Sequence, residues 1–427
     1  MKLLARCAVA VSLLIVAGCA GDTAADDGTV TISFLSYNYG TPDIGGQGTQ
    51  ELLDAFHAAH PEITVKPEGV AVKDVLTKLR TDTAAGSAPD VAQIGWSKMA
   101  EAYANLPIVP LPDIAGPEWQ PHVAGMSPEI MKATAVDGVN KAMPYTMSVP
   151  VTYYNADLFT AAGLDPARPP KTMAELKEAG LKLSAAGGNG IYIGVVETGK
   201  SDFLTQSLIG SNGGSLVGPD GSVTVDQPAA VEALAGVQDL VKSGAMPGIK
   251  ADEALSLFSA GKLGALITST AFLAAAEKAA QGSFDLRTTG FPAYGDKPAR
   301  PTYSGAGLAV LAKDEAKQKA AWELVKFLTS EQGFTIITKK IGYLPLRPAI
   351  VTDPKYLADY FASDDRLKPS LDQLPTVAPY TAFPGKRANE AVVTLQDEAV
   401  EPIVLRGADP AKTLGEVAGK IRTMTSG

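Results

Sequence analysis

The sequence predicts an α/β protein of two lobes, and three observations lead to this prediction. Strand-like and helix-like segments alternate between residues 29 and 95, which is the order of a mostly parallel, doubly wound sheet. The alternation starts again after a proline-punctuated stretch at 143–170. The last third of the chain is rich in amphipathic helical segments. We therefore expect the chain to leave one lobe, cross at 143–170 and found a second lobe.

The first predicted lobe opens with an alternating, β-rich run, TVTISFLS. After it, Leu52, Leu53 and Phe56 share one face of a helical segment that Pro61 ends. Ligands of doubly wound sheets bind at the carboxyl ends of strands, so the loops after the first and third strands are candidate contact sites. We expect strands at 29–36, 63–70 and 91–95 and helices at 49–60 and 73–84.

The crossing stretch, MPYTMSVPVTYYNADLFTAAGLDPARPP, changes character along its length. A hydroxyl-bearing run at 145–148 leads into a β-favouring run at 149–154. A short helix is expected at 156–162, before a glycine that would end it. Thr172 then begins another helix as its N-cap, with Glu175 three residues on as the capping-box partner.

Beyond residue 172 the alternation continues and then gives way to helices. The run at 264–268 is apolar and short, as a fully buried strand would be. Ala321, Leu324 and Val325 recur at helical spacing in a later segment. We expect strands at 191–196, 215–217, 222–225, 264–268, 284–291 and 307–311 and helices at 172–186, 202–210, 228–242, 253–260, 315–328, 331–339, 354–362, 388–400 and 410–425.

The N-terminus has the form of an export signal. A basic start precedes a ten-residue apolar run, which is too short to span a membrane and is typical of a signal peptide. The tetrad ending at Cys19, VAGC, resembles the lipobox of bacterial lipoproteins, whose cysteine becomes the acylated first residue. The alternative is an ordinary signal peptide with a chance cysteine. We expect a signal peptide at 1–18, a flexible tether at 19–28, and an extracytoplasmic protein anchored to the outer face of the cell membrane by lipidated Cys19.

The composition excludes several classes of partner and cofactor. The chain is 46% hydrophobic and 19% charged, with a formal net charge of −9. It has no basic cluster of the kind that binds nucleic acid or an anionic membrane. The only cysteines are Cys7 and Cys19, so the exported form would have neither a disulfide nor a thiolate metal site. No motif indicates a cofactor, a metal or a catalytic nucleophile.

A family resemblance rests on several segments that occur in order along the chain. They are FLSYNYG, ELLDAFHAAHPEITV, AAGSAPDVAQI, MPYTMSVPVTYYNADLFTAAGLDPARPPKT, ALSLFSAGKLGALI, SGAGLAVLAK and IGYLPLRP. Together they resemble the extracellular solute-binding proteins (family 1) of ATP-driven carbohydrate importers, and most closely the glycerol-3-phosphate and glycerophosphodiester-binding subgroup. The resemblance spans essentially the whole mature chain.

The resemblance implies a type II periplasmic-binding-protein-like fold, with a ligand cleft between two discontinuous lobes. The first lobe would comprise 29–144 and 271–314, and the second 145–270 and 315–427. The protein would be a monomer and would bind a sugar or polyol without catalysis, or alternatively glycerol-3-phosphate or a glycerophosphodiester. It would deliver this ligand to the permease subunits of an ABC importer.

Eight residues are candidate ligand contacts. Trp96 follows a predicted strand and would form a stacking platform for a sugar, and Tyr37 and Tyr39 lie in the loop after the first strand. The resemblance implies hydroxyl contacts from Ser148 and Thr270. The remaining three that it implies are Gly305, where a close backbone approach needs glycine, Tyr343, and Arg387.

The same comparison leaves the ligand open. The glycerol-phosphate subgroup carries a tyrosine where this chain has Val72 and a glutamate where it has Trp96. The side that would hold phosphate looks retained, whereas the side that would hold glycerol looks changed. Either a sugar or a glycerophosphodiester with another head group fits this pattern.

Three other readings of the sequence are weaker. An exported glycoside hydrolase needs two cleft carboxylates about 5–10 Å apart, and the predicted cleft loops offer only Asp43. An adhesion lipoprotein would fill the space between its lobes. The segment 194–201, GVVETGKS, matches the phosphate-binding loop pattern, but its valines favour continuation of a strand.

Overall fold

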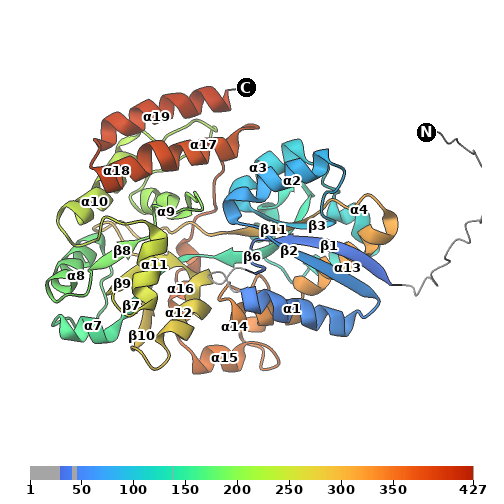
Figure 1. Ribbon diagram of the computed structural model, residues 1–427, viewed down its shortest axis with the longest axis horizontal. Helices are drawn as coiled ribbons and strands as arrows, with labels where there is room; N and C mark the ends of the chain where they lie inside the picture. The colour runs from blue at the N-terminus through green and yellow to red at the C-terminus, as the bar shows by residue number, and fades with distance from the viewer. Residues whose placement is uncertain (1–28, 41–45, 137, 427) are drawn as a thin grey trace, which may run out of the picture.

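The computed structural model describes residues 29–40, 46–136 and 138–426. Figure 1 shows two lobes side by side, each built on its own sheet. Cys19 and the expected tether lie outside the described residues. Within the described part, no helix combines the length and the apolar character needed to cross a membrane.

The first lobe contains a five-stranded sheet whose central strand is parallel to one neighbour and antiparallel to the other. β1 is parallel to β2 and β3, whereas β11 is antiparallel to both β3 and β6. The expected parallel order therefore holds apart from β11. In spatial order the strands are β2 (Ile63–Gly69), β1 (Val30–Ser36), β3 (Val91–Gly95), β11 (Ser304–Val310) and β6 (Ala142–Ser148).

Helices cover this sheet because their apolar faces match it. Leu52 and Phe56 of α1 are fully buried, and α13 packs against β1 and β11. The helices of this lobe are α1 (Gly46–Ala59), α2 (Val75–Ala84), α3 (Trp96–Asn105), α4 (Leu111–Ala115), α5 (Trp119–Val123), α6 (Pro128–Lys132), α13 (Glu315–Leu328) and α14 (Glu331–Lys340), and a small pair is formed by β4 (Ala135–Val136) and β5 (Val139–Asn140).

The second lobe contains a four-stranded sheet and most of the helices. Its strands, in spatial order, are β10 (Leu286–Thr289), β7 (Pro150–Asn155), β9 (Ala265–Ser269) and β8 (Ile191–Ile193). Its helices are α7 (Ala156–Ala161), α8 (Met173–Ala185), α9 (Phe203–Ser211), α10 (Pro228–Lys242), α11 (Ala251–Ser259), α12 (Leu273–Ala280), α15 (Ala358–Ser363), α16 (Lys368–Asp372), α17 (Ala388–Leu395), α18 (Glu401–Arg406) and α19 (Pro410–Thr425).

Local signals in the sequence set the ends of several elements. The predicted capping box is confirmed: Thr172 Oγ1 accepts a hydrogen bond from the Glu175 amide (3.2 Å), and the Glu175 carboxylate accepts one from the Thr172 amide (3.1 Å). The expected helix at 388–400 is interrupted, because a π-helical turn (Gln396–Val400) separates α17 from α18. The predicted strands at 215–217 and 222–225 form only an isolated bridge.

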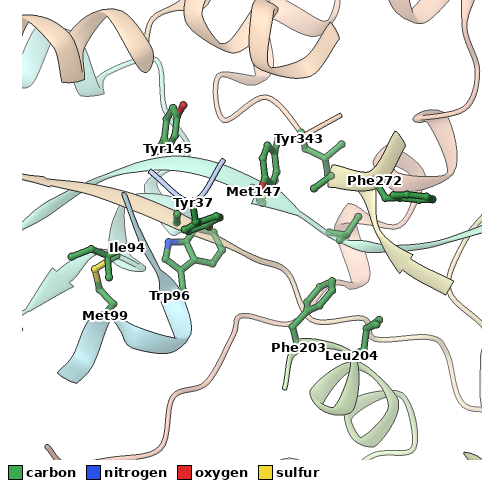
Figure 2. Close-up of a cluster of buried hydrophobic side chains, with 14 of the residues drawn as sticks. Tyr37, Ile94, Trp96, Met99, Tyr145, Met147, Phe203, Leu204, Phe272 and Tyr343 are labelled. Carbon is green, nitrogen blue, oxygen red and sulfur yellow. The ribbon is translucent and has the colours of Figure 1, made fainter. Parts of the chain in front are cut away.

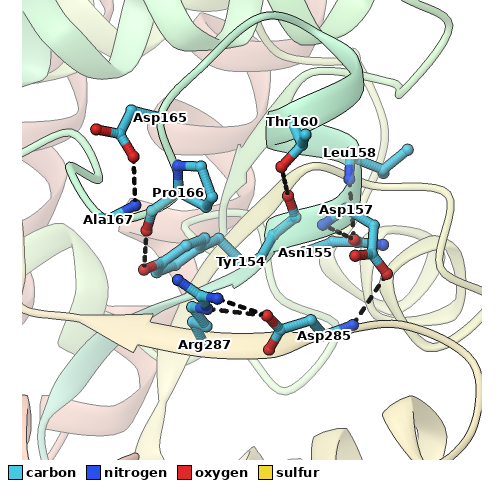
Figure 3. A network of polar contacts seen from close by, with 11 residues as sticks. Tyr154, Asn155, Asp157, Leu158, Thr160, Asp165, Pro166, Ala167, Asp285 and Arg287 are labelled. Carbon is cyan, nitrogen blue, oxygen red and sulfur yellow. Dashed lines mark hydrogen bonds and ion pairs between the residues drawn. The ribbon is translucent and has the colours of Figure 1, made fainter.

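A polar network anchors the beginning of the second lobe (Figure 3). Asn155 caps α7 by accepting hydrogen bonds from the amides of Asp157 and Leu158 (3.0 and 3.1 Å). The Asp157 carboxylate accepts a further hydrogen bond from the amide of Asp285 (3.1 Å), just before β10. These contacts fix β10 in the second lobe, beside the strand that opens it.

The lobe boundaries therefore differ from the expected ranges. The segment 271–289 belongs to the second lobe, because β10 pairs with β7 and α12 packs against β10. The segment 315–340 belongs to the first lobe, because α13 packs on β1 and α14 packs on α1. The first crossing lies at 148–150, between β6 and β7, rather than near 144. These boundaries depend on strand pairing and helix packing between segments that are far apart in sequence, and local sequence patterns do not reveal such contacts.

Candidate functional site

The ends of the two sheets face one another where the chain first crosses between the lobes. β1, β3 and β6 run in the same direction, so Tyr37, Trp96 and Ser148 come at the same edge of the first sheet. From the second sheet, Thr270 follows β9, and its amide donates to the carbonyl of Val149 (3.1 Å). Ligands of α/β sheets bind at such edges.

A cleft of about 770 Å³ opens beside this junction. Its surface is largely apolar and includes four aromatic rings. Two of them, Trp96 and Tyr303, are in edge-to-face contact at 5.2 Å between ring centroids. Its size is that of a small-molecule site, and rigid rings suit the apolar C–H faces of a sugar. The described residues that line it are Trp96, Met99, Ala100, Tyr103, Ser127, Ile130, Lys132, Ala133, Ala135, Met147, Tyr303, Pro345, Leu346, Pro348, Leu374, Val377, Pro379, Tyr380 and Ala382.

The floor of the cleft is shared by the two lobes. Figure 2 shows Ile94 and Met99 of the first lobe in one buried cluster with Phe203 and Phe272 of the second. Trp96, at the start of α3, is only 5% exposed. The lobes thus meet through packed side chains, and the ring of Trp96 lies between that packing and the open cleft.

Several buried polar atoms at the junction have no hydrogen-bond partner. They include Trp96 Nε1, the Tyr145 hydroxyl and Thr270 Oγ1. A buried donor without an acceptor costs about 1–3 kcal/mol. Departures of this kind are expected at functional sites more than in ordinary cores.

Three buried tyrosines make the junction polar but uncharged. Burial raises the pKa of Tyr37 to about 12 and also raises the pKa values of Tyr145 and Tyr343. The Tyr343 hydroxyl donates a long hydrogen bond to Asn38 Oδ1 (3.4 Å). These phenols therefore remain protonated at physiological pH and act as neutral hydrogen-bonding groups.

A group of charged side chains lies behind one wall of the cleft. Lys98 is 3% exposed on α3, and burial lowers the pKa of its ammonium group, although the charges of Asp202, Glu101 and Glu197 act in the opposite direction. Burial raises the pKa of Asp202, and hydrogen bonds from Gln206 and Tyr380 partly offset this rise. Glu101 is also paired with Arg80 (2.8 Å), so the positive and negative groups of this cluster largely balance one another.

The structure brings most of the predicted contact residues to the junction. Trp96 lines the cleft, and Tyr37, Ser148 and Thr270 are buried at the sheet edges beside it. Tyr343 is held next to them, because the amide of the following residue, Leu344, donates to the carbonyl of Met147 (2.8 Å).

Gly305 is a glycine for a reason other than the predicted one. A Cβ atom at this position would lie 1.8 Å from the carbonyl oxygen of Thr146. The pairing of β11 with β6 shifts register just after it, between Ala306 and Gly307. Glycine is therefore required here because the backbone of the neighbouring strand β6 lies so close to it.

Two predicted contacts lie elsewhere. Arg387 is about half exposed, and its guanidinium group binds the Glu390 carboxylate (2.7 and 2.5 Å) at the start of α17. It is not among the described residues that line the cleft, and neither is Tyr39, whose carbonyl lies against Gly69 at the end of β2. The residue numbers alone could not show that α17 packs on the outer side of α3.

Sequence reasoning missed much of the aromatic lining. Tyr103 lies within α3, Tyr303 directly precedes β11, and Tyr380 lies in the irregular segment before α17. Tyr303 could have been found from its position at a strand end, as Trp96 was. Tyr380 carried no such signal.

In the segment 194–201, which matches the phosphate-binding loop pattern, Lys200 forms ion pairs with Asp397 and with Glu401 (3.8 Å). This lysine is therefore already engaged with carboxylates.

Comparison with known proteins gives a consistent result. Residues 39–333 match the family model described as bacterial extracellular solute-binding protein. A protein of Brucella abortus named only as a binding protein is 26% identical over 406 residues, which is 93% of each chain. The sn-glycerol-3-phosphate-binding periplasmic protein UgpB of Agrobacterium fabrum is 30% identical over 253 residues, which is 56% of each chain.

Solved structures share the fold. UgpB from Mycobacterium tuberculosis in complex with glycerophosphocholine is 24% identical, with a TM-score of 0.79 over 93% of this chain and 98% of that one. The GacH receptor of Streptomyces glaucescens, solved with and without acarbose, is 21% identical, with a TM-score of 0.80 over the same shares of the two chains. At these identities the likeness shows the fold alone.

Proposed function

The chain belongs to the bacterial extracellular solute-binding protein family, and from this premise we propose that it captures a neutral sugar or polyol in its interlobe cleft. The bound ligand is then delivered to the membrane permease of an ABC importer. In this role the two lobes close around the ligand by a hinge motion.

The lining of the cleft carries this proposal. Trp96, Tyr103, Tyr303 and Tyr380 provide four aromatic rings, and the junction tyrosines provide neutral hydroxyl groups. Among the described lining residues there is no arginine to form the bidentate contacts that phosphate favours. Arg387, the predicted phosphate partner, is engaged with Glu390.

A second candidate ligand is glycerol-3-phosphate or a glycerophosphodiester. The similarity to UgpB proteins supports it, and Lys132 brings one cationic group to the cleft lining. A lysine binds phosphate as a point charge, without the geometry of an arginine fork. The absence of an arginine among the described lining residues therefore favours the neutral ligand.

Isothermal titration calorimetry of the mature chain decides between these ligands. A panel of neutral mono- and oligosaccharides, polyols, glycerol-3-phosphate and glycerophosphocholine would be titrated in turn. We expect a neutral member to bind with a Kd of about 1 μM or tighter, which corresponds to about −8 kcal/mol, and inorganic phosphate not to compete. Tight binding of only the phosphorylated members would establish the second candidate, and binding of none would refute the proposal.

Binding without chemistry is the expected activity. The family comprises binding proteins, and the protein would release its ligand unchanged. Chromatography of the ligand after prolonged incubation with the protein tests this, and a hydrolysed product would instead support the exported glycoside hydrolase.

The proposed location is the outer face of the cell membrane, where lipidated Cys19 would anchor a monomer. The supporting observations are the lipobox-like tetrad before Cys19 and the extracellular family. We expect Cys19→Ala to move the protein from the membrane fraction to the soluble fraction of expressing cells. Retention of the variant in the membrane fraction would count against the anchor.

A further inference from the structure

We propose that Asp202 is a positioning residue of the cleft, because its buried carboxylate holds the phenol of Tyr380 in one wall of the cleft. This inference rests on the proposed function, because it assigns a role within the same cleft. Asp202 does not line the cleft itself. It would act on the ligand only through residues that do.

The carboxylate of Asp202 is buried, and each of its two oxygens accepts a hydrogen bond. Asp202 is 0% exposed. The Tyr380 hydroxyl donates to its Oδ1 at 2.7 Å, and the Gln206 amide nitrogen donates to its Oδ2 at 3.0 Å. Hydrogen bonds to an ionised acceptor are about twice as strong as neutral ones, so the phenol oxygen of Tyr380 is held firmly at one point.

The backbone beside Tyr380 is attached to the same helix. Gln206 Nε2 donates to the carbonyl of Thr381 (2.9 Å), and the Thr381 amide donates to Gln206 Oε1 (3.1 Å). Asp202 and Gln206 lie four residues apart at the start of α9. Together they fix the main chain of Thr381 and the phenol of Tyr380 in an otherwise irregular segment, so the Tyr380 ring has a set position in the cleft wall.

The start of α3, in the first lobe, is the nearest part of that lobe to Asp202 and Tyr380 that these interactions identify. The Ser97 side chain acts to lower the pKa of the Tyr380 phenol, against the effect of burial, and the charge of Asp202 acts to raise the pKa of the Lys98 ammonium group. Both residues directly follow Trp96 in sequence. The first turn of α3, which carries Trp96, therefore lies within the electrostatic reach of Asp202, whereas the hydrogen bonds of its carboxylate go to Tyr380 and Gln206.

A purely structural role explains this arrangement less well. Burying a carboxylate near other carboxylates is costly, and an apolar or amide side chain of the same size is often as stable or more stable. The groups that Asp202 holds belong to the cleft or adjoin it. Pre-organised binding walls lose less conformational freedom when a ligand binds, and this gain in affinity accounts for the buried charge.

The test uses the neutral ligand that binds best in the calorimetric panel. Tyr380→Phe keeps the ring and removes the hydroxyl, Asp202→Ala removes the carboxylate, and Asp202→Asn keeps an acceptor and removes the charge. We expect Tyr380→Phe and Asp202→Ala each to weaken binding at least tenfold and their combination to weaken it no further, since both remove one coupling. Asp202→Asn should weaken binding less.

Asp90→Asn is the matched control, because Asp90 is also buried (6% exposed) but is held by Ser33 and Lys317 in the first lobe. It should lower the melting temperature and leave the Kd unchanged. The proposal is overturned if the Asp202 and Tyr380 variants lower the melting temperature while binding like the unaltered protein. Independent, additive losses of affinity would also overturn it. If Asp202→Ala does not fold, Asp202→Asn and Tyr380→Phe complete the same comparison.

A second measurement needs no ligand and separates this proposal from the proposed function. Hydrogen–deuterium exchange of the unliganded protein should rise in 377–382 and in the first turn of α3 when Asp202 is changed to Asn, and not when Asp90 is changed. Unaltered exchange in both segments would overturn the positioning role even if every sugar bound. Failure of the whole panel with the unaltered protein would instead refute the proposed function.

Discussion

Two buried aspartates of this protein show how one kind of side chain serves two purposes. Asp90 lies inside the first lobe, where it accepts hydrogen bonds from the amide and hydroxyl of Ser33 (2.8 and 3.0 Å) and from Lys317 (3.1 Å). Asp202 lies at the lobe junction, where its partners are Tyr380, which lines the cleft, and Gln206. The first therefore stabilises the interior of one lobe, and the second holds a residue of the cleft wall. Changes near Asp90 should alter folding, whereas changes near Asp202 should alter binding.

The largest effect is expected from removing the carboxylate inside the first lobe. Asp90→Ala leaves the partly buried donors of Ser33 without their acceptor, and it should lower the free energy of unfolding by roughly 2–4 kcal/mol. Urea denaturation measures this loss. The Kd of the folded fraction should stay within twofold of the unaltered value, and a large loss of affinity would remove the contrast between the two aspartates.

The next effect concerns the floor of the cleft. Trp96→Phe keeps an aromatic ring but removes the buried Nε1 donor and part of the stacking surface. We expect a tenfold to thirtyfold weaker Kd, or about 1.4–2 kcal/mol, measured by calorimetry. Met126→Leu, a volume-conserving change at a buried site that does not line the cleft, is the control. An unchanged Kd for Trp96→Phe would remove Trp96 from the binding site.

A smaller effect follows from the pH dependence of the junction. Burial beside the charges of Asp202 and Asp252 raises the pKa of Glu197 to about 8, and Lys98 acts in the opposite direction. The folded state therefore holds a proton that the unfolded chain has lost above its ordinary pKa, so this contribution to stability is lost as the pH rises from about 4.5 to about 8.

One proton held over this range of about 3.5 pH units could contribute at most about 4.8 kcal/mol. Because Glu197 is only partly buried, we expect a smaller total loss of about 1 kcal/mol. Urea denaturation at pH 5, 6.5 and 8 measures it. Glu197→Gln should flatten the profile over this range, while Glu253→Gln, on α11 outside this cluster, should not. A stability profile that rises towards pH 8 would contradict the assignment.

The smallest effect is expected at Arg387, the predicted contact that the structure places outside the cleft lining. Its ion pair with Glu390 is exposed, and such pairs contribute about 0–1 kcal/mol. Arg387→Ala should leave both the melting temperature and the Kd for a neutral ligand nearly unchanged. A collapse of affinity for glycerol-3-phosphate in this variant would favour the phosphate-containing ligand and a different placement of the arginine.

Much of the fold could be predicted because its signals are local. The capping box at Thr172 and Glu175, the buried run that became β9, and the helical spacing that became α13 each depend on residues within a few turns of one another. Trp96 and Tyr37 were found for a related reason. Each follows a strand end, and the common direction of β1 and β3 brings strand ends to one edge.

By itself, the sequence determined the two-lobed α/β plan, most element positions and the candidate Trp96. Hydrophobic periodicity, helix capping and helix-ending glycines or prolines depend on residues close together in sequence, so they can be recognised from the sequence alone. Only the tertiary structure decided that β10 belongs to the second lobe and α13 to the first, and that Arg387 lies outside the cleft lining. It also decided that Tyr380, Asp202 and Lys98 lie near one another. Those three residues are far apart in sequence, and their contact depends on strand pairing and on how the lobes pack. The buried carboxylate behind Tyr380 is visible only once that packing is known.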